Sequence, residues 1–360
     1  MRIVKSFFQR KDVILSPKRY FITALSAMAQ GLFCTLLVGT ILNTLGAQLH
    51  IPFLENPIAG GMTIGAMASS MVGPGIAVAI AYSLNAPALV LFSLLPVGYA
   101  TNLLGGAGGP LAVYLVAIIA TECGKLVSKE TKIDILVTPI VTILVGIGLA
   151  SLIAQPVGRA ANAVGDAIMW ATDLQPLLMG ILVSVLVGIA LTLPISSAAI
   201  CMSLGLVGLA GGAAVAGCCA QMVGFAVMSF RENRWGGLVA QGLGTSMLQM
   251  PNIVKNPRIW IPPILASAIT GPLATCVFQL QMNGAAVNSG MGTCGLCGQI
   301  GVWTGWVNDV SLGLKDSITS WDWLGLVLIC FVLPAIISLV FCELLRKIGW
   351  IRKDDLKLNL

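Results

Sequence analysis

Charged residues are scarce in this sequence. Of its 360 residues only 9% are Asp, Glu, Lys or Arg, whereas 57% are apolar, and the mean hydropathy is +0.94. A soluble domain carries about 25% charged residues, so this chain cannot cover a surface that faces water. We therefore expect an all-α polytopic membrane protein, because helices satisfy their own backbone hydrogen bonds in lipid.

Residue types that carry catalysis or bind metals are equally sparse. Histidine occurs once, at His50, and no paired carboxylates or Ser-His-Asp arrangement are present, which predicts that the protein is not an enzyme. The glycine run at 105–110 lacks the Lys-Ser/Thr of a phosphate-binding loop. Cys294 and Cys297 have C-x-x-C spacing, but without a second pair or a nearby histidine we interpret them as small packing residues. We expect neither a cofactor nor a metal.

Eighteen of the 20 basic residues form five short clusters, which predict the topology; Arg159 and Lys315 lie elsewhere. The clusters lie within residues 2–19, 125–132, 231–234, 255–258 and 346–357. Loops rich in Lys and Arg remain in the cytoplasm, so both termini and these loops are predicted to be inside. Five of the eight tryptophans then fit an aromatic belt at the outer interface: Trp170, Trp303, Trp306, Trp321 and Trp323.

Apolar runs predict eight to ten membrane crossings. They lie within a single transporter-like domain, 21–345, between a cytoplasmic N-terminal segment, 1–20, and a cytoplasmic tail, 346–360. The predicted spans are 21–49, 58–82, 86–102, 110–126, 133–154, 176–194, 195–230, 259–281 and 323–345.

Some of these predicted spans have special features. The run 58–82 should break at Gly73-Pro74-Gly75, and the run 195–230 is long enough for two short spans or a hairpin. Residues 155–175 should form a polar connection on the outer side. Glu122, near the inner end of its span, is expected to cap the membrane interface.

Two glycine-rich stretches cannot cross the membrane, because each is predicted to begin and end on one side. They are residues 236–252, on the cytoplasmic side, and 284–305, on the outer side, and each contains a Gly-x-Gly-Thr sequence, at 242–245 and 290–293. We interpret them as two re-entrant hairpins entering from opposite faces, since broken glycine-rich segments mark transport sites. The alternative is a close-packed helix–helix stripe of small residues.

Neutral polar residues of the two hairpins are predicted to line a substrate site. The primary candidates are Thr245, Ser246, Gln249, Asn288, Ser289, Thr293 and Gln299, and the secondary candidates are Ser196, Ser197, Gln221 and Asn102. Because these groups are uncharged, the ligand should be a small polar solute, with a sugar and an organic anion as the two candidate classes. The charge of an anion would be met by backbone N–H groups at helix N-termini.

Four segments carry a resemblance to a known family. They are SPKRYFITALSAMAQGLFCTLLVGTILNTLG (16–46), GGMTIGAMASSMVGPGIAVAIA (60–81), GLGTSMLQMPNIVKNPRIWIPP (242–263) and GMGTCGLCGQIG (290–301). Over nearly its whole length the chain resembles the phosphotransferase-system subunit IIC-like integral membrane family, which includes the perfringolysin-regulator-like proteins. The resemblance implies a bacterial plasma-membrane protein, a sugar-permease-like fold, a homodimer, and a movable transport domain that carries the hairpins.

The sequence also departs from that family. IIC permeases commonly present a Glu and a His near the sugar, but neither hairpin contains an acid or a histidine, and no soluble IIB-like domain is fused. We therefore expect an elevator-like permease without fused phosphotransfer domains. A separate IIB-type partner stays open, and no nucleic acid partner is expected. The alternative function is a membrane regulatory or sensor protein that keeps the IIC-like fold but does not transport.

Overall fold

The computed structural model describes residues 7–358, apart from the side chains of residues 48 and 49. These residues form helices and no β-strand, except for two isolated bridges, one of which pairs Gly208 with Met282. The all-α class expected from the composition is confirmed. Residues 1–6 lie outside the described part, and with them Arg2 and Lys5, two members of the first basic cluster. The chain divides into two compact units, Met1–Ala160 and Ala161–Leu360.

The first unit begins with a long apolar stretch, Arg19–Ala47, of 29 residues. Its axis is interrupted by single π-helical turns, and the elements along it are η1 (Arg19–Ala24), α2 (Leu25–Leu32), η2 (Phe33–Leu37) and α3 (Val38–Leu49). A short helix, α4 (Pro52–Glu55), follows. Close packing against the next helices depends on glycine, since a Cβ at Gly31 would lie 2.5 Å from the carbonyl oxygen of Gly75.

The predicted break in the second apolar run lies slightly earlier than expected. Helices α5 (Ile64–Ser70) and α6 (Val72–Ser83) are bent by 54° at Met71, not at Gly73-Pro74-Gly75. Pro74 stands in the first turn of α6, where a residue without an N–H is tolerated because that N–H has no intrahelical acceptor. The proline therefore starts a helix instead of breaking one.

Helices α7 (Ala88–Gly105) and α8 (Gly109–Val127) form an antiparallel hairpin. They are joined by η3 (Gly106–Gly108), and Gly106 has φ of 51°, a left-handed conformation that glycine adopts without strain. The opposite ends of the two helices also meet, since a Cβ at Gly124 would lie 2.8 Å from the side chain of Val90. The two predicted spans 86–102 and 110–126 are therefore separate helices of 18 and 19 residues.

Helix α9 (Asp134–Thr172) is longer than predicted. The sequence favoured a span that ends at residue 154 and a polar connection over 155–175, but the helix continues for 39 residues. At 1.5 Å per residue this is about 58 Å, nearly twice the thickness of the hydrocarbon core. The predicted end of the span at residue 154 was wrong, and most of the polar stretch 155–175 is carried on the extension of the helix, which ends at Thr172.

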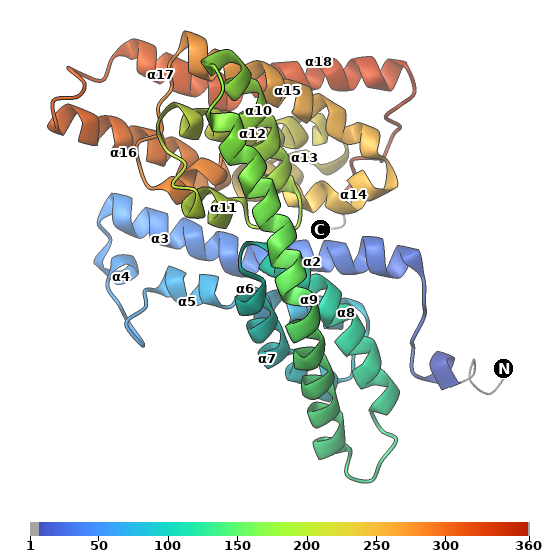
Figure 1. The fold of residues 1–360 in the computed structure, drawn as a ribbon. Helices are drawn as coiled ribbons and strands as arrows, with labels where there is room; N and C mark the ends of the chain where they lie inside the picture. The colour runs from blue at the N-terminus through green and yellow to red at the C-terminus, as the bar shows by residue number, and fades with distance from the viewer. Residues whose placement is uncertain (1–6, 359–360) are drawn as a thin grey trace. The chain divides into compact units, whose positions relative to one another are not determined.

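The second unit is organised around α12 (Gly208–Met228). In the apolar stretch of this helix, 89% is buried inside the protein. Helices α10 (Pro176–Thr192), α15 (Ile261–Pro272) and α18 (Leu333–Lys347) pack against it (Figure 1). Small residues allow this approach, because lipid-embedded helices gain stability mainly from close contact. A Cβ at Gly224 of α12 would lie 2.6 Å from the hydroxyl oxygen of Ser338 on α18.

The remaining elements of the second unit are short. They are α11 (Ser197–Ser203), α13 (Phe230–Val239), η4 (Ala240–Gly244), η5 (Ser246–Gln249), α14 (Met250–Lys255), η6 (Pro257–Trp260), η7 (Leu273–Val277), η8 (Ala286–Gly290), η9 (Cys294–Leu296), α16 (Cys297–Ser311), α17 (Ser320–Val327) and η10 (Leu328–Val332). The predicted long run 195–230 thus divides into α11, of 7 residues, and α12, of 21 residues.

The number of crossings depends on how broken helices are counted. Within the described residues, six stretches are long and apolar enough to cross a membrane, and the bent pair α5–α6 makes a seventh. One of the six, Ala88–Val127, contains both α7 and α8, and α10 falls just short at 17 residues. A multi-pass membrane protein is confirmed. The prediction of eight to ten crossings counted α7, α8 and α10 as separate spans.

Candidate functional site

The first glycine-rich segment is not a continuous helix. Arg234 has φ of 51°, which kinks α13, and the chain then passes through the π-helical turn η4. Thr245 is extended, with φ of −158°, and its side chain accepts a hydrogen bond from the backbone N–H of Met247 at 3.1 Å. This cap starts the 3-10 turn η5, so the predicted motif residues 242–246 lie at a break between two short helical pieces.

The second segment is broken at its glycines. Gly292 and Gly295 have φ of 55° and 51°, and Leu296 follows with φ of 60° before α16 begins at Cys297. Gly298 and Gly301 continue the series of glycines at every third position from Gly292 and let this turn fold back onto α16. A Cβ at Gly298 would lie 2.5 Å from the carbonyl oxygen of Gly292, and one at Gly301 would lie 2.7 Å from the Cβ of Asn288. The series therefore builds a compact turn.

The two broken segments meet each other. The turn η4 of the first packs against η9 of the second, and α12 is contacted by η4 and by η8 of the second segment. Gly292 lies so close to α12 that a Cβ there would be 2.6 Å from the Cβ of Cys218, while Gly242 approaches Ala226 two turns further along the same helix. The two Gly-x-Gly-Thr sequences are thus placed on one face of the central helix of the unit.

A buried network links the first segment to the end of α10. The hydroxyl oxygens of Thr192 and Ser246 lie 2.8 Å apart, and Thr192 also donates to Oε1 of Gln221 at 3.3 Å. The same oxygen accepts from the indole Nε1 of Trp260 at 2.9 Å, and the amide nitrogen of Gln221 donates to Ser267 at 3.4 Å. Ser246 and Gln221, two predicted residues, are therefore joined through a residue that the sequence did not suggest.

The second segment is held to α11 and α12 by its own polar groups. Ser197 donates to the carbonyl oxygen of Gly290 at 2.8 Å, and Ser289 donates to that of Leu206 at 2.5 Å. Thr293 donates to the sulfur of Met222 at 3.5 Å, a weak acceptor. These predicted residues are buried in the part of the molecule where the broken segments meet.

Gln299 is the one member of the predicted set with an unsatisfied buried atom. Its side chain is 7% exposed, its Nε2 donates to Sγ of Cys219 at 3.1 Å, and its Oε1 has no partner among the described residues. Exchanging the two amide atoms would leave the nitrogen unpaired instead. A buried amide atom without a partner costs about 1–3 kcal/mol, so this position favours a group that is supplied from elsewhere.

Gln249 belongs to a different network, which reaches the C-terminal tail. Its Nε2 donates to Oε1 of Gln241 at 2.8 Å and to the carbonyl oxygen of Leu356 at 3.0 Å, and its Oε1 accepts from Asn252 at 2.9 Å. Asn252 in turn donates to the carbonyl oxygen of Lys357 at 2.9 Å. This chain of amides fastens the first broken segment to the tail.

In the described part of the chain, the other predicted residues, Ser196, Asn288 and Asn102, do not belong to either network. Ser196 caps α11 by accepting from the N–H of Ala199 at 3.2 Å, and Asn288 is half-buried beside Gly301. Asn102 lies on α7 of the first unit, against Gly109. Ten of the eleven predicted residues therefore fall in the second unit.

Sequence reasoning missed Thr192, Trp260 and Gln241. Thr192 ends α10 just before Leu193 and Pro194, and a helix stop inside an apolar run was its available signal. The sequence suggested no hydrogen-bonding role for Trp260, although its indole N–H needs a partner when it is buried. Gln241 stands within the first predicted hairpin and could have been included on that ground.

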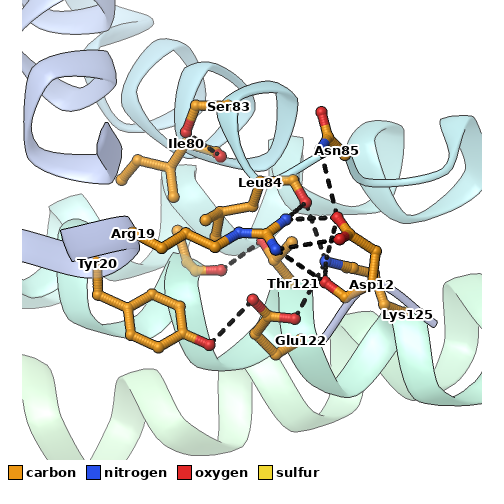
Figure 2. Close-up of polar contacts among 11 residues, drawn as sticks. Asp12, Arg19, Tyr20, Ile80, Ser83, Leu84, Asn85, Thr121, Glu122 and Lys125 are labelled. Atoms are coloured by element: carbon orange, nitrogen blue, oxygen red, sulfur yellow. Dashed lines mark hydrogen bonds and ion pairs between the residues drawn. The ribbon is translucent and has the colours of Figure 1, made fainter. Parts of the chain in front are cut away.

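A second buried polar cluster lies in the first unit (Figure 2). Nζ of Lys125, which is 2% exposed, donates to the carbonyl oxygens of Asp12 and Leu84 at 2.6 and 2.9 Å and lies 3.2 Å from the Glu122 carboxylate. Arg19 also binds Asp12 and the Leu84 carbonyl, and Tyr20 donates to Glu122 at 3.1 Å. Glu122 is therefore part of a paired cluster that clamps residues 12–19 onto helix ends.

A comparison with protein-family models identifies the family of this chain. The model described as Phosphotransferase system, EIIC, matches residues 22–358, nearly the whole chain. The chain belongs to this EIIC family. EIIC domains are membrane components of sugar transporters, not catalytic subunits, and they work with other proteins of the phosphotransferase system. Searches of curated proteins and of solved structures found no match.

Proposed function

We propose that this EIIC protein carries a small, uncharged polar solute, a sugar, across the bacterial plasma membrane by alternating access. In this proposal the two broken segments are re-entrant hairpins, and the place where they meet on α12 is the substrate site. The residues predicted from the sequence in the second unit form or flank that site, together with Thr192, Trp260 and Cys219.

The unpaired amide atom of Gln299 carries this proposal. It is a buried hydrogen-bonding group next to glycine-broken backbone, in a region lined by neutral hydroxyls and amides. Neither broken segment contains a charged side chain within 236–252 or 284–305. Neutral donors and acceptors match the hydroxyl groups of a sugar, and an anion would have to rely on backbone N–H groups alone.

Charge placement supports an orientation with both termini in the cytoplasm. In the first unit, Glu130 pairs with Arg10 at 2.7 Å and with Lys11, which joins the first two basic clusters. In the second unit, Arg346 pairs with Glu232 at 2.8 Å, so the tail cluster joins the one at 231–234. The basic clusters of each unit thus gather, as the positive-inside rule requires of loops on one side.

The proposed motion is a displacement of the second unit, which bears the hairpins, while the first unit acts as scaffold. Thr192, Ser246 and Gln221 are paired with one another, so a sugar would enter by replacing these hydrogen bonds with its own hydroxyl groups. Such an exchange conserves the number of buried hydrogen bonds and keeps its cost low. The proposal includes a homodimer and leaves phosphotransfer to separate partner proteins.

Binding by purified protein tests the site. Gln299→Leu removes the unpaired amide but keeps a side chain of similar length, so it should weaken sugar binding about five- to tenfold and leave the protein at least as stable. Gln155→Leu, at an exposed position on α9, is the matched control. A thermal-shift panel of sugars and organic anions identifies the ligand, and uptake into proteoliposomes distinguishes a transporter from a regulatory protein. Equal binding by both variants would rule out this site.

A further inference from the structure

A cavity of about 370 Å³ lies in the second unit, away from the broken segments' contact on α12. Its walls come from the chain after η7, the end of α16, and the start of α17. The first wall is pinned by the bridge between Met282 and Gly208, whose two N–H···O distances are both 2.9 Å. Gly305 lets the same wall approach α16, because a Cβ there would lie 2.7 Å from the backbone nitrogen of Asn283. The cavity is therefore built on fixed backbone.

Aromatic rings form the apolar part of the lining. Trp321 and Phe278 lie with centroids 4.9 Å apart and planes tilted by 31°. Trp321 is 51% exposed, so part of its indole faces the open side of the cavity, whereas Trp306 is buried at 3% exposure. An exposed indole at a cavity wall offers a flat surface to the C–H groups of a ligand.

Polar side chains form much of the rest of the lining. Asn283 donates to Oδ2 of Asp309 at 2.7 Å and to Oε1 of Gln281 at 3.2 Å. That leaves Oδ1 of Asp309, the amide nitrogen of Gln281 and the whole amide of Gln279 without side-chain partners among residues 7–358. Both donors and acceptors are therefore available to a ligand within one cavity.

The charges of the lining exclude an anion. Lys315 is bound to Asp322 at 2.7 Å, so this pair is neutralised, and the remaining charge is that of Asp309. A ligand that carries a negative charge would meet the Asp309 carboxylate, which has no cationic partner among the described residues. A neutral compound with several hydroxyl groups can donate to Asp309 and accept from the glutamine amides at the same time.

We propose that this cavity, lined by Trp321, Phe278, Gln279, Gln281 and Asp309, is a second binding site for a neutral polyhydroxy compound of monosaccharide size. The cavity is large enough for such a ligand, since small-molecule sites begin at about 300 Å³. The choice of ligand class rests on the proposed function, but the site is separate from the one around Gln299. On the predicted topology it opens to the outside, where it would capture the solute before transport.

Ligand-observed NMR on the purified full-length protein tests this site, with hexoses, hexitols and choline as probes. Trp321→Ala should weaken sugar binding to it about tenfold, and Asp309→Asn, which keeps an acceptor for Asn283, should weaken it about threefold or more. Trp170→Ala, an exposed tryptophan outside the cavity, is the control and should have no effect. Asp309→Asn keeps the shape of the lining, so the test does not depend on Trp321→Ala alone.

The outcomes separate the two proposed sites. Loss of binding in the cavity variants, with or without an effect of Gln299→Leu, supports the cavity site. Loss in Gln299→Leu alone overturns the cavity site and leaves the proposed function standing. If choline is the one probe that binds, or if the native protein binds no sugar, the assignment of a neutral polyhydroxy ligand is overturned.

Discussion

The hydroxyl oxygens of Thr192 and Ser246 lie 2.8 Å apart, although 54 positions separate the two residues. Thr192 ends α10, and Ser246 begins the turn η5 after the extended Thr245. This contact joins the end of the 17-residue helix α10 to the break in the first glycine-rich segment. Both side chains are fully buried, so their hydroxyl groups depend on each other and on Gln221 for hydrogen bonds.

A double-mutant cycle measures this coupling. Thr192→Val and Ser246→Ala should each destabilise the protein, and the double variant should be more stable than the sum predicts by about 0.5–1 kcal/mol, because each single change leaves the other hydroxyl short of a partner. The free energy of unfolding in mixed detergent micelles gives the four values. Strict additivity would show that the two hydroxyl groups do not interact.

The polar residues of the second unit could be predicted from the sequence because few residue types can serve there. In an apolar chain, Ser246 and Gln299 stand out as buried hydrogen-bonding groups next to glycine breaks, and Gln221 stands out within the continuous helix α12. Their partners could not be predicted, since pairings such as that of Thr192 with Ser246 depend on how α10 and η5 pack. The sequence could name candidates on two segments, but only the structure assigns Gln249 to the amide chain that reaches the tail.

Helix ends were the weaker part of the fold prediction. The class and the hairpin of α7 and α8 followed from apolar runs and glycine, but the break in 58–82 lies at Met71 and not at Gly73-Pro74-Gly75, and α9 passes through residue 154 without stopping. Polar residues over 155–175 suggested a connection, yet a helix that leaves the hydrocarbon core can carry polar residues without ending. Pro156 did not stop it either, because prolines are tolerated inside membrane helices.

Gly292 and Thr293 are expected to respond very differently to substitution. Gly292→Leu places a side chain at φ of 55°, 2.6 Å from the Cβ of Cys218, so it should disrupt the turn and abolish binding. Thr293→Val keeps the shape and loses one weak bond to the Met222 sulfur, so it should cost less than about 1 kcal/mol of stability and weaken sugar binding a few-fold. Tm values and sugar titrations of both variants check this. Native binding by both would mean that the glycines serve packing only.

Labelling of single cysteines should reveal the proposed topology. In a cysteine-free background, a cysteine at Lys129 or Arg231 should react with a membrane-impermeant reagent only after the cells are opened. One at Asp316, in the exposed connection after α16, should react in intact cells. The basic clusters at the first two positions predict this difference. Labelling at Lys129 from outside would refute the orientation.

The clamp around Asp12 should make stability depend on pH at the acidic end. Hydrogen bonds from Arg19 and Asn85 lower the pKa of the Asp12 carboxyl from 3.8 to about 2. A depressed pKa stabilises the folded state above the unfolded value, and this contribution is lost as the pH falls from about 4 to about 2. Because the side chain is 40% exposed, solvent screening limits the effect to about 1 kcal/mol.

Asp12→Asn therefore should lower the Tm at pH 7 and remove this part of the acid sensitivity. Asp166→Asn, at an exposed position on α9, is the control and should leave both unchanged. Thermal unfolding of the three proteins between pH 2 and pH 7 provides the comparison. An identical pH profile for Asp12→Asn and the native protein would show that the clamp contributes nothing to stability.

The C-terminal tail should contribute to the stability of the first broken segment. Leu356 is fully buried in a cluster with Phe225, Ile253 and Ile259, and its carbonyl oxygen accepts from Asn233 at 2.8 Å as well as from Gln249. Leu356→Ala leaves the carbonyl in place but creates a cavity, so it should destabilise the protein by about 2–4 kcal/mol.

Lys357→Ala is the matched control, because this neighbouring side chain is exposed and only its carbonyl oxygen bonds to Asn252. It should change the free energy of unfolding by less than about 0.5 kcal/mol. If the tail also holds η5 in position through Gln249, Leu356→Ala should weaken sugar binding, whereas Lys357→Ala should not. Chemical unfolding and sugar titration of both variants decide this. A stable Leu356→Ala protein would show that the tail packs against the segment without supporting it.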